Sequence, residues 1–128
     1  MTTQRVSSAS PYEAHYGFCR ALRRGNHVFV AGTAPINPDG SSCPKTATDQ
    51  ARRCFTIMLD ALQQLGGTSD DVVRTRMFIT NAEDRHPIGE VHGEFFAENP
   101  PVATMVVVAS LLDPRWKCEM ELEAFVAD

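Results

Sequence analysis

The sequence predicts an α+β domain with two helices on one face of a mixed sheet. Apolar residues recur every three or four positions over residues 46–65, and acidic and apolar residues alternate over 117–126. The expected elements follow in the order hairpin, helix, strand, helix, strand, strand. With 128 residues, 43% of them hydrophobic, the chain can bury one sizeable core but not two. Residues 1–128 are therefore expected to form a single domain.

The N-terminal part is expected to be a loop followed by a β-hairpin. The first 17 residues are mainly polar and contain one candidate short strand at Arg5-Val6-Ser7. Phe18 to Leu22 and His27 to Ala31 have strand-like composition, and Gly25-Asn26 between them tolerates the positive φ angles of a tight turn. Prolines and glycine break the following stretch, which predicts a loop over residues 34–45.

The first helix is predicted over residues 46–65. One apolar stripe at helical spacing supports it, made by Ala51, Cys54, Phe55, Met58, Leu62 and Leu65. Thr46 or Thr48 can cap the N-terminus of this helix, because a threonine hydroxyl accepts a hydrogen bond from a free backbone N–H. Gly66-Gly67 supplies the left-handed residue that ends it.

A strand and a second helix are predicted next. The strand runs from Val72 to Asn81, with Arg74 and Arg76 on one face and Val73, Thr75 and Met77 on the other. The second helix begins at Ala82 or Arg85 and ends at Glu98. Its Gly89 and Gly93, one turn apart, each weaken the helix by about 1 kcal/mol relative to alanine, which indicates close packing or a nearby ligand.

Two strands are expected at the C-terminal end, paired with each other. Residues 100–109 are apolar on both faces, as is typical of a covered central strand, while residues 117–126 alternate acidic and apolar side chains. Asp113-Pro114 between them predicts a turn and so an antiparallel pair. The sheet face without helices would be lined by Val107, Ala109 and Leu111. An exposed apolar face of this kind indicates contact between subunits of a homo-oligomer.

Composition argues against several classes of function. The net charge of −4 and the lack of long basic runs disfavour nucleic acid as a partner. Four scattered cysteines without a CxxC pair, and four histidines without HxH or HxxxH spacing, indicate neither a metal nor another cofactor. The sequence shows no signal-peptide core and no apolar run of about 18 residues, so a cytoplasmic protein without membrane contact is expected.

Glu121 is the first candidate for a reactive group held in a fixed place. Glu119, Glu121 and Glu123 share one face of the alternating strand. From the residues alone, these three carboxylates are equally consistent with a solvated sheet face.

Several segments of the sequence occur in the same order and with the same spacing as in a known protein family. They are GFCRALRRGNHVFVAGTAP at 17–35, DQARRCFTIMLDALQQLGG at 49–67, DVVRTRMFIT at 71–80, HGEFF at 92–96, and the terminal PPVATMVVVASL and CEMELEAFV. Together they resemble the Rid family, also called YjgF/YER057c/UK114, over nearly the whole chain.

The resemblance implies a chorismate-mutase-like fold in which three subunits close their sheets around a central barrel, with ligand clefts between neighbouring subunits. It also implies hydrolysis of reactive imines and enamines, such as 2-aminoacrylate, to a keto acid and ammonia without a cofactor. In that activity an arginine clamps the substrate carboxylate and a backbone amide assists. A water molecule, helped by a glutamate, attacks the imine carbon.

The match to the family's site is partial. The resemblance places the backbone amide at Gly32 and the glutamate at Glu121, in Glu-Leu-Glu-Ala. The family's arginine follows Pro-Ala, whereas here Pro101-Val102 is followed by Ala103. The tyrosine, asparagine and cysteine of the family's cleft fall on Phe18, Gly89 and Met105. Because a charge-assisted hydrogen bond contributes about 1.5–3 kcal/mol, 2-aminoacrylate is not the expected substrate.

Further residues could complete such a cleft. Arg20, or less readily Arg76, could replace the missing cation, although an ordinary surface position fits each of them better. His92, one turn beyond Gly89, could face the cleft or lie on the helix surface. Partial burial of Glu121 against Phe18 and Met105 would favour its protonated form and suit it to proton transfer near neutral pH.

Two classes of function stay open at this point. The first is an enzyme that deaminates a small imine, enamine or related unsaturated carbonyl compound, larger and less charged than an amino-acid imine. Glu121 would be its acid and base, and Gly32 would contact the electrophile. The second is a module that binds a metabolite in the same clefts without turnover, which the missing arginine favours. The net negative charge of the chain disfavours a third class, ribonuclease activity.

Overall fold

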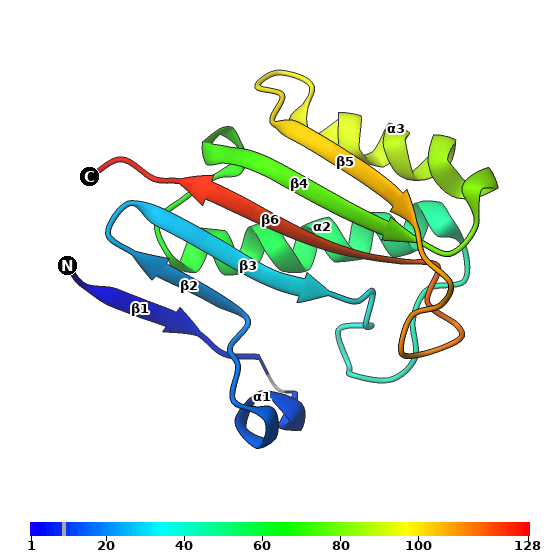
Figure 1. Cartoon of the computed structure of the whole chain (residues 1–128), viewed down its shortest axis with the longest axis horizontal. Helices are drawn as coiled ribbons and strands as arrows, with labels where there is room; N and C mark the ends of the chain where they lie inside the picture. Colours follow the sequence, from blue (N-terminus) through cyan, green and yellow to red (C-terminus); the bar gives the residue numbers. More distant parts are fainter. Residues whose placement is uncertain (9) are drawn as a thin grey trace.

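The strands form one mixed sheet, and helices α2 and α3 lie on one of its faces (Figure 1). The computed structural model describes residues 1–8 and 10–128. In chain order the elements are β1 (Thr3–Val6), α1 (Pro11–Tyr16), β2 (Ala21–Arg24), β3 (His27–Thr33), α2 (Ala47–Gln64), β4 (Val72–Ile79), α3 (Arg85–Phe96), β5 (Val102–Val107) and β6 (Cys118–Phe125). Short 3₁₀ turns at Ser69–Asp71 and Ala82–Asp84 precede β4 and α3. The sheet order is β1-β2-β3-β6-β4-β5, so the predicted α+β class is confirmed.

The N-terminal segment is more ordered than the sequence predicts. β1 pairs antiparallel with β2, and β2 and β3 form the expected hairpin around Gly25, whose φ is 61°. The loop expected before the hairpin contains the short helix α1. The hydroxyl of Ser10 caps α1 by accepting from the Tyr12 N–H, and Gly17 ends it at φ 78°. Six residues are too few to display a helical stripe, which explains why the sequence pattern missed this helix.

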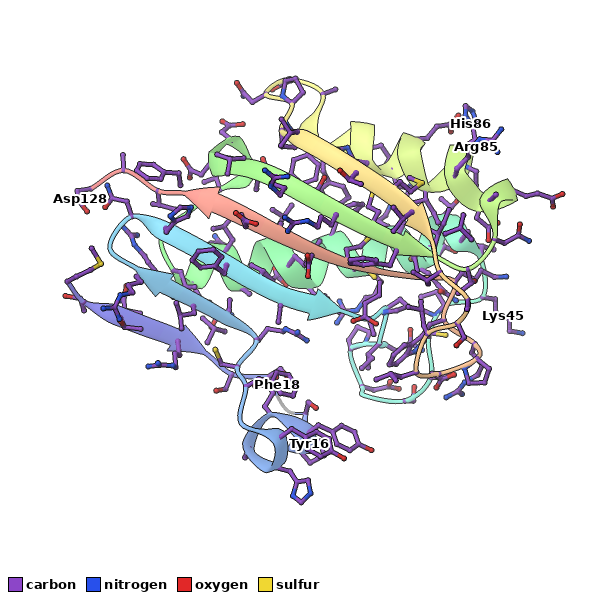
Figure 2. All side chains as sticks on the ribbon, in the orientation of Figure 1. Tyr16, Phe18, Lys45, Arg85, His86 and Asp128 are labelled. Atoms are coloured by element: carbon purple, nitrogen blue, oxygen red, sulfur yellow. The ribbon has the colours of Figure 1, made fainter. Side chains whose placement is uncertain are left out.

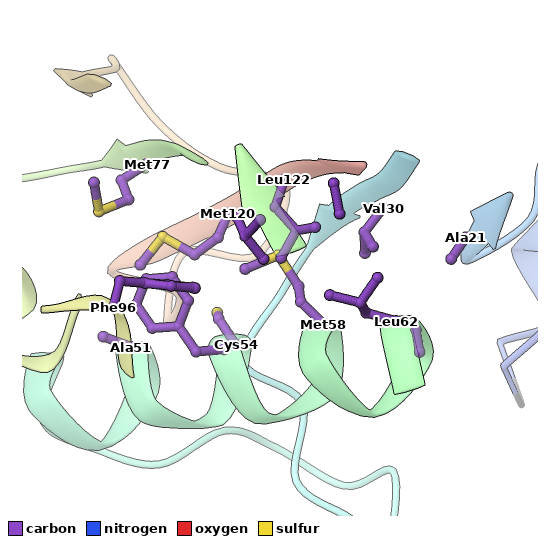
Figure 3. Packing of buried hydrophobic residues seen from close by; sticks show 14 of the residues in the cluster. Ala21, Val30, Ala51, Cys54, Met58, Leu62, Met77, Phe96, Met120 and Leu122 are labelled. Carbon is purple, nitrogen blue, oxygen red and sulfur yellow. The ribbon is translucent and has the colours of Figure 1, made fainter. Parts of the chain in front are cut away.

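Helix α2 packs its apolar stripe against the sheet and so forms the core, as the sequence pattern predicts. Thr46 caps it by accepting from the Asp49 N–H at 3.1 Å, and Gly66 follows its end at φ 93°. Cys54, Phe55, Met58 and Leu62 are fully buried, and Figure 3 shows Cys54, Met58 and Leu62 directed from the helix toward the sheet. The sheet contributes the alternate residues of β6, Met120 and Leu122 among them.

Strand β4 and helix α3 lie where the sequence predicts them, with two local differences. Val73 is exposed rather than buried, because the pairing of β4 with β6 shifts register between Val72 and Arg74. Gly89 and Gly93 are not close-packed within the subunit, since a Cβ built on either meets no described atom within 4 Å.

The predicted pairing of the C-terminal strands is wrong. β5 pairs in parallel with β4, and β6 lies between β4 and β3, antiparallel to both. Helix α3 carries the chain from β4 across to β5, and such a crossover makes the two strands parallel. β5 is therefore not a covered central strand: it is the last strand in the sheet order, with Val102 and Val107 exposed.

The face of the sheet opposite the helices carries apolar side chains, but not the predicted ones. Val107 pairs with buried Ile79 on the helix side, and Ala109 and Leu111 follow the end of β5. The register instead places on the uncovered face Leu22, Phe29, Phe78, Val102 and Val106. An apolar uncovered face thus exists, on different residues from those expected.

Candidate functional site

A cavity of about 750 Å³ lies between the N-terminal segment and the uncovered face of the sheet. Phe18 lines this cavity and lies two residues after the end of α1. Figure 2 shows it beside Tyr16 at the junction of α1 and β2. The sheet contributes Phe29 from β3 and Glu121 from β6. The structure therefore brings Phe18 and Glu121 to one cavity.

Glu121 is held by an ion pair. Arg76 lies directly across from it on β4 and contacts it at 3.1 Å. The same guanidinium contacts Glu123 at 3.2 Å, and Arg74 approaches Glu123 at 3.9 Å. The Glu121 side chain is 34% exposed and therefore partly buried, but Met105, one of the residues expected to cover it, lies on the helix side of the sheet. Arg76 consequently holds Glu121 in place and is shared between two carboxylates.

Arg20 is a half-buried cation in the wall of the same cavity. Its Nη2 donates to the carbonyl of Gly32 at 2.6 Å, which ties the guanidinium to the end of β3. Its Nε is buried and has no hydrogen-bond partner among the described residues. Burial lowers the pKa of Arg20, while the nearby carboxylates Glu13 and Glu119 act in the opposite direction. An arginine so placed stays protonated at neutral pH.

Glu119 lies beside Gly32, where the chain leaves little space. A Cβ built on Gly32 would lie 2.6 Å from Oε2 of Glu119. Burial raises the pKa of Glu119, Arg20 partly offsets this, and Glu121 adds to it. Sequence reasoning treated Glu119 as a structural or solvated residue. Its position in the alternating acidic strand was visible, but its contact with the β3 end depends on how β3 and β6 pair.

The remaining predicted site residues lie on the other side of the sheet. His92 shares a hydrogen bond of 2.7 Å with the hydroxyl of Thr75, and burial lowers its pKa. Its ring packs against Phe55 and Phe96. Thr75 pairs with Ala103 across the β4–β5 ladder, and Met77 pairs with Met105 in the same way. Ala103 and Met105 therefore share the helix side with His92, and Gly89 lies one turn before it on α3.

The predicted site thus falls into two groups within one subunit. Phe18, Arg20, Gly32 and Glu121 belong to the cavity side, and Gly89, His92, Ala103 and Met105 belong to the α3–β5 edge. The sheet separates Glu121 from Ala103, because Glu121 shares its face with Arg76 and Ala103 shares its face with Thr75.

Helix α1 contributes Tyr12, Glu13 and Tyr16 to the N-terminal segment beside the cavity. Glu13 is buried and accepts from the Ser8 N–H at 3.0 Å and from the Ser8 hydroxyl. Tyr12 and Tyr16 are exposed and stack on each other with ring centroids 5.7 Å apart. Glu13 therefore anchors this segment against the cavity that it also lines.

The described residues contain neither a cluster of metal ligands nor a membrane-spanning helix. Across residues 1–8 and 10–128, no group of three histidine, cysteine or acidic side chains is arranged to hold a metal ion. None of the helices described combines the length and apolar composition needed to cross a bilayer.

Comparison with known proteins decides the family. A family model described as Endoribonuclease L-PSP matches residues 7–126. The crystal structure of Rv2704 from Mycobacterium tuberculosis, a member of the YjgF/YER057c/UK114 family, superposes with a TM-score of 0.89 and 36% identity, covering 98% of this chain and 100% of that one. The chain belongs to the Rid family.

Other Rid relatives cover the chain equally well. A protein of Streptomyces coelicolor named only as uncharacterized, SCO2049, is 33% identical over 95% of this chain and 91% of its own length. TdcF of Escherichia coli, provisionally named a reactive intermediate deaminase, is 31% identical over the same shares. A crystal structure of TdcF holds bound serine and superposes with a TM-score of 0.82, covering 96% of this chain and 94% of that one. Two fission-yeast relatives are named as mitochondrial, so a cytoplasmic location stays a prediction for this chain.

Proposed function

We propose that this protein hydrolyses a small reactive imine or enamine without a cofactor, in clefts between neighbouring subunits of a homotrimer. The observation that carries the proposal is Glu121, which reaches the wall of the cavity beside Phe18. Membership of a family that includes a reactive intermediate deaminase supports the reaction class.

A cleft between subunits would bring the cavity-side residues of one subunit next to the α3–β5 edge residues of another. Glu121 lies on the uncovered face, and Ala103 lies on the edge strand β5 and faces the helix side. A neighbouring subunit that docks its β5 edge against this cavity would add its own copies of Gly89, Ala103 and Met105. We therefore place the complete site between two chains.

The reaction needs one carboxylate and one water molecule. The water oxygen forms a bond to the imine carbon while Glu121 accepts a proton from the water and passes it to the imine nitrogen, which gives a carbinolamine with an amino group. Glu121 then accepts the hydroxyl proton of the carbinolamine and delivers it to this nitrogen as the C–N bond breaks. The nitrogen leaves as ammonia, and the carbon keeps the oxygen as a carbonyl group. Gly32 would contact the polarised group through its backbone N–H, as the resemblance implies.

The substrate is proposed to be larger than an amino-acid imine. Ala103 stands where the resemblance expects the clamping arginine, so 2-aminoacrylate lacks its usual partner. Phe18 and Met105 would instead offer apolar surface to a longer carbon chain.

Release of ammonia from imines generated in solution tests this function. Glu121→Gln keeps the shape of the side chain but removes its basicity, and we expect the rate to fall about 100-fold or more. Glu123→Gln is the matched control, because it lies on the same strand face and also contacts Arg76. The control should stay within a few-fold of the parent. Parental rates in Glu121→Gln would contradict the assigned role.

The second candidate is binding of a metabolite without turnover. The ion pair between Arg76 and Glu121 favours it, since a carboxylate oxygen in contact with a guanidinium is less free to contact a water molecule. Saturable binding together with no ammonia from any imine would establish this alternative. We also expect Ala103→Arg to gain activity on α-imino acids if the cleft is otherwise intact.

Nucleic acid is not among the proposed partners, although the family description names an endoribonuclease. Glu119, Glu121 and Glu123 place three carboxylates on the uncovered face, and this arrangement repels phosphate.

A further inference from the structure

Arg5, Arg20 and Arg76 are the three arginines that line the cavity, and their partners differ. Arg76 is shared between Glu121 and Glu123. Arg5 is exposed on β1. Arg20 is half-buried, and within the described part of the chain no carboxylate lies within 4.0 Å of its nitrogens. Among the described residues, Arg5 and Arg20 thus have no direct carboxylate partner, and of these two Arg20 is the one half-buried in the cavity wall.

Arg20 is also held in position before any ligand arrives. Its backbone N–H donates to the Val6 carbonyl at 2.8 Å, and its own carbonyl accepts from the Ala31 N–H at 2.9 Å. The guanidinium is tied to the Gly32 carbonyl at 2.6 Å. A side chain fixed in this way loses little conformational freedom when a ligand binds.

The guanidinium has hydrogen-bonding capacity left over. A guanidinium carries five donors in a planar fork. Nη2 has a partner and Nε is buried, whereas Nη1 makes no hydrogen bond to the described residues and is not buried, so its donors remain for a ligand. A carboxylate matches this fork, which is why arginine is favoured where carboxylates are recognised.

The two carboxylates nearest to Arg20 leave its charge largely available. Glu13 accepts from the backbone and the hydroxyl of Ser8, so its oxygens are committed elsewhere. Glu119 makes no ion pair within 4.0 Å in the described residues, and burial raises its pKa, which disfavours its charged form. Cys19 and Cys54 are the other titratable groups that influence Arg20.

We propose that Arg20 is the anion-binding group of this cavity and that it receives the carboxylate of the ligand. It would take over, from the residue just before β2 and from the cavity side of the sheet, the task that the resemblance gives to an arginine at the position of Ala103. The inference rests on the proposed function only in taking that ligand to be the imine substrate. It corrects the expectation of a weakly charged substrate to an unsaturated carboxylic acid whose carboxylate lies toward Arg20.

Binding of two isosteric probes, benzoate and benzamide, tests this inference independently of turnover. Titrations followed by calorimetry and by backbone amide shifts should show the parent binding benzoate at least tenfold more tightly than benzamide at pH 7. Equal affinities for the two probes would overturn the proposal without any variant.

Variants then assign the effect to one arginine. Arg20→Gln should lower benzoate affinity on the order of 10- to 100-fold, because a charge-assisted hydrogen bond is lost, and should leave benzamide affinity unchanged. Arg20→Lys should recover part of this affinity. Arg5→Gln removes the same charge from an exposed position of the cavity and should have little effect. An unchanged affinity in folded Arg20→Gln, or an equal loss in Arg5→Gln, would overturn the assignment.

Ammonia release measured on the same samples separates the two proposals. Benzoate binding that depends on Arg20, without ammonia release by the parent, would leave the anion site standing and remove the hydrolase. Ammonia release by a parent protein that shows no preference for benzoate would support the hydrolase and remove the anion site.

Discussion

Glu119 and Glu121 differ by two positions on one strand face, and their surroundings give them different properties. Glu121 lies opposite Arg76, whereas Glu119 lies opposite Phe78 and beside Gly32. Burial raises the pKa of Glu119 above its ordinary value. The neighbour on β4 therefore decides which carboxylate is ion-paired and which is desolvated.

This difference predicts how stability depends on pH. A raised pKa means that folding favours the protonated form of Glu119, so its contribution to stability is present at low pH and is lost as pH rises above its ordinary value. Glu119→Gln should therefore raise the melting temperature by a few degrees at pH 7, and the gain should shrink toward pH 4.

Thermal melts of the parent and two variants between pH 4 and pH 8 check this prediction. Glu123→Gln serves as the control, because it removes contacts with Arg74 and Arg76 and should not stabilise the protein. A Glu119→Gln variant that is less stable than the parent at pH 7 would refute the predicted sign.

At the scale of elements, the sequence correctly predicts the helices and turns whose signals lie within a short segment of the chain. Helix α2 carries its own cap at Thr46 and its own apolar stripe, and the β2–β3 hairpin carries its own turn at Gly25. The partners of β5 and β6 were not predictable from these signals. A strand that is covered by its own subunit and a strand that is covered by another subunit can both be apolar, so composition alone does not tell them apart.

The candidate site shows the same division. Glu121 was found from its strand pattern and from the family resemblance. The tie between Arg20 and the Gly32 carbonyl, and the contact of Glu119 with Gly32, depend on pairing between distant strands. His92 lies on the helix-covered side, because α3 packs against the face of β4 that carries Thr75.

Two glycines give a matched prediction about packing. A Cβ on Gly67 would lie 2.5 Å from Leu62 Cδ1 and 2.9 Å from Val126 Cγ2, so Gly67→Ala should lower the free energy of unfolding by about 1–3 kcal/mol. A Cβ on Gly89 meets nothing within 4 Å, so Gly89→Ala should raise it by about 0.5–1 kcal/mol through better helix propensity. Urea unfolding measures both changes, and a loss of stability in Gly89→Ala would contradict the open surroundings of α3.

At the scale of the whole molecule, the uncovered face and the β5 edge predict assembly. Phe29 and Val106 are each 43% exposed on this face, and Val102 is 60% exposed on the edge strand. Apolar surface in this arrangement is typical of a subunit interface. We expect light scattering to give a mass of three chains for the parent.

A charge on the uncovered face should break this assembly. Val106→Asp would bury an unpaired carboxylate between subunits and should yield smaller species with weaker ligand binding. Leu112→Asp, at a position that is 95% exposed, should keep the parental mass. A parent protein that sediments as a single chain would contradict the proposed cleft between subunits.

Hydrolysis in this cavity can be tested by following the fate of an imine. An amino-acid oxidase generates imines of increasing chain length in the presence of semicarbazide, which traps whatever imine survives. The parent protein should lower the yield of trapped semicarbazone and speed ammonia release, most strongly for imines larger than 2-aminoacrylate, and Glu121→Gln should abolish both effects. Unchanged trapping and ammonia release across the whole series, with folded protein, would contradict hydrolysis as the function of this cavity.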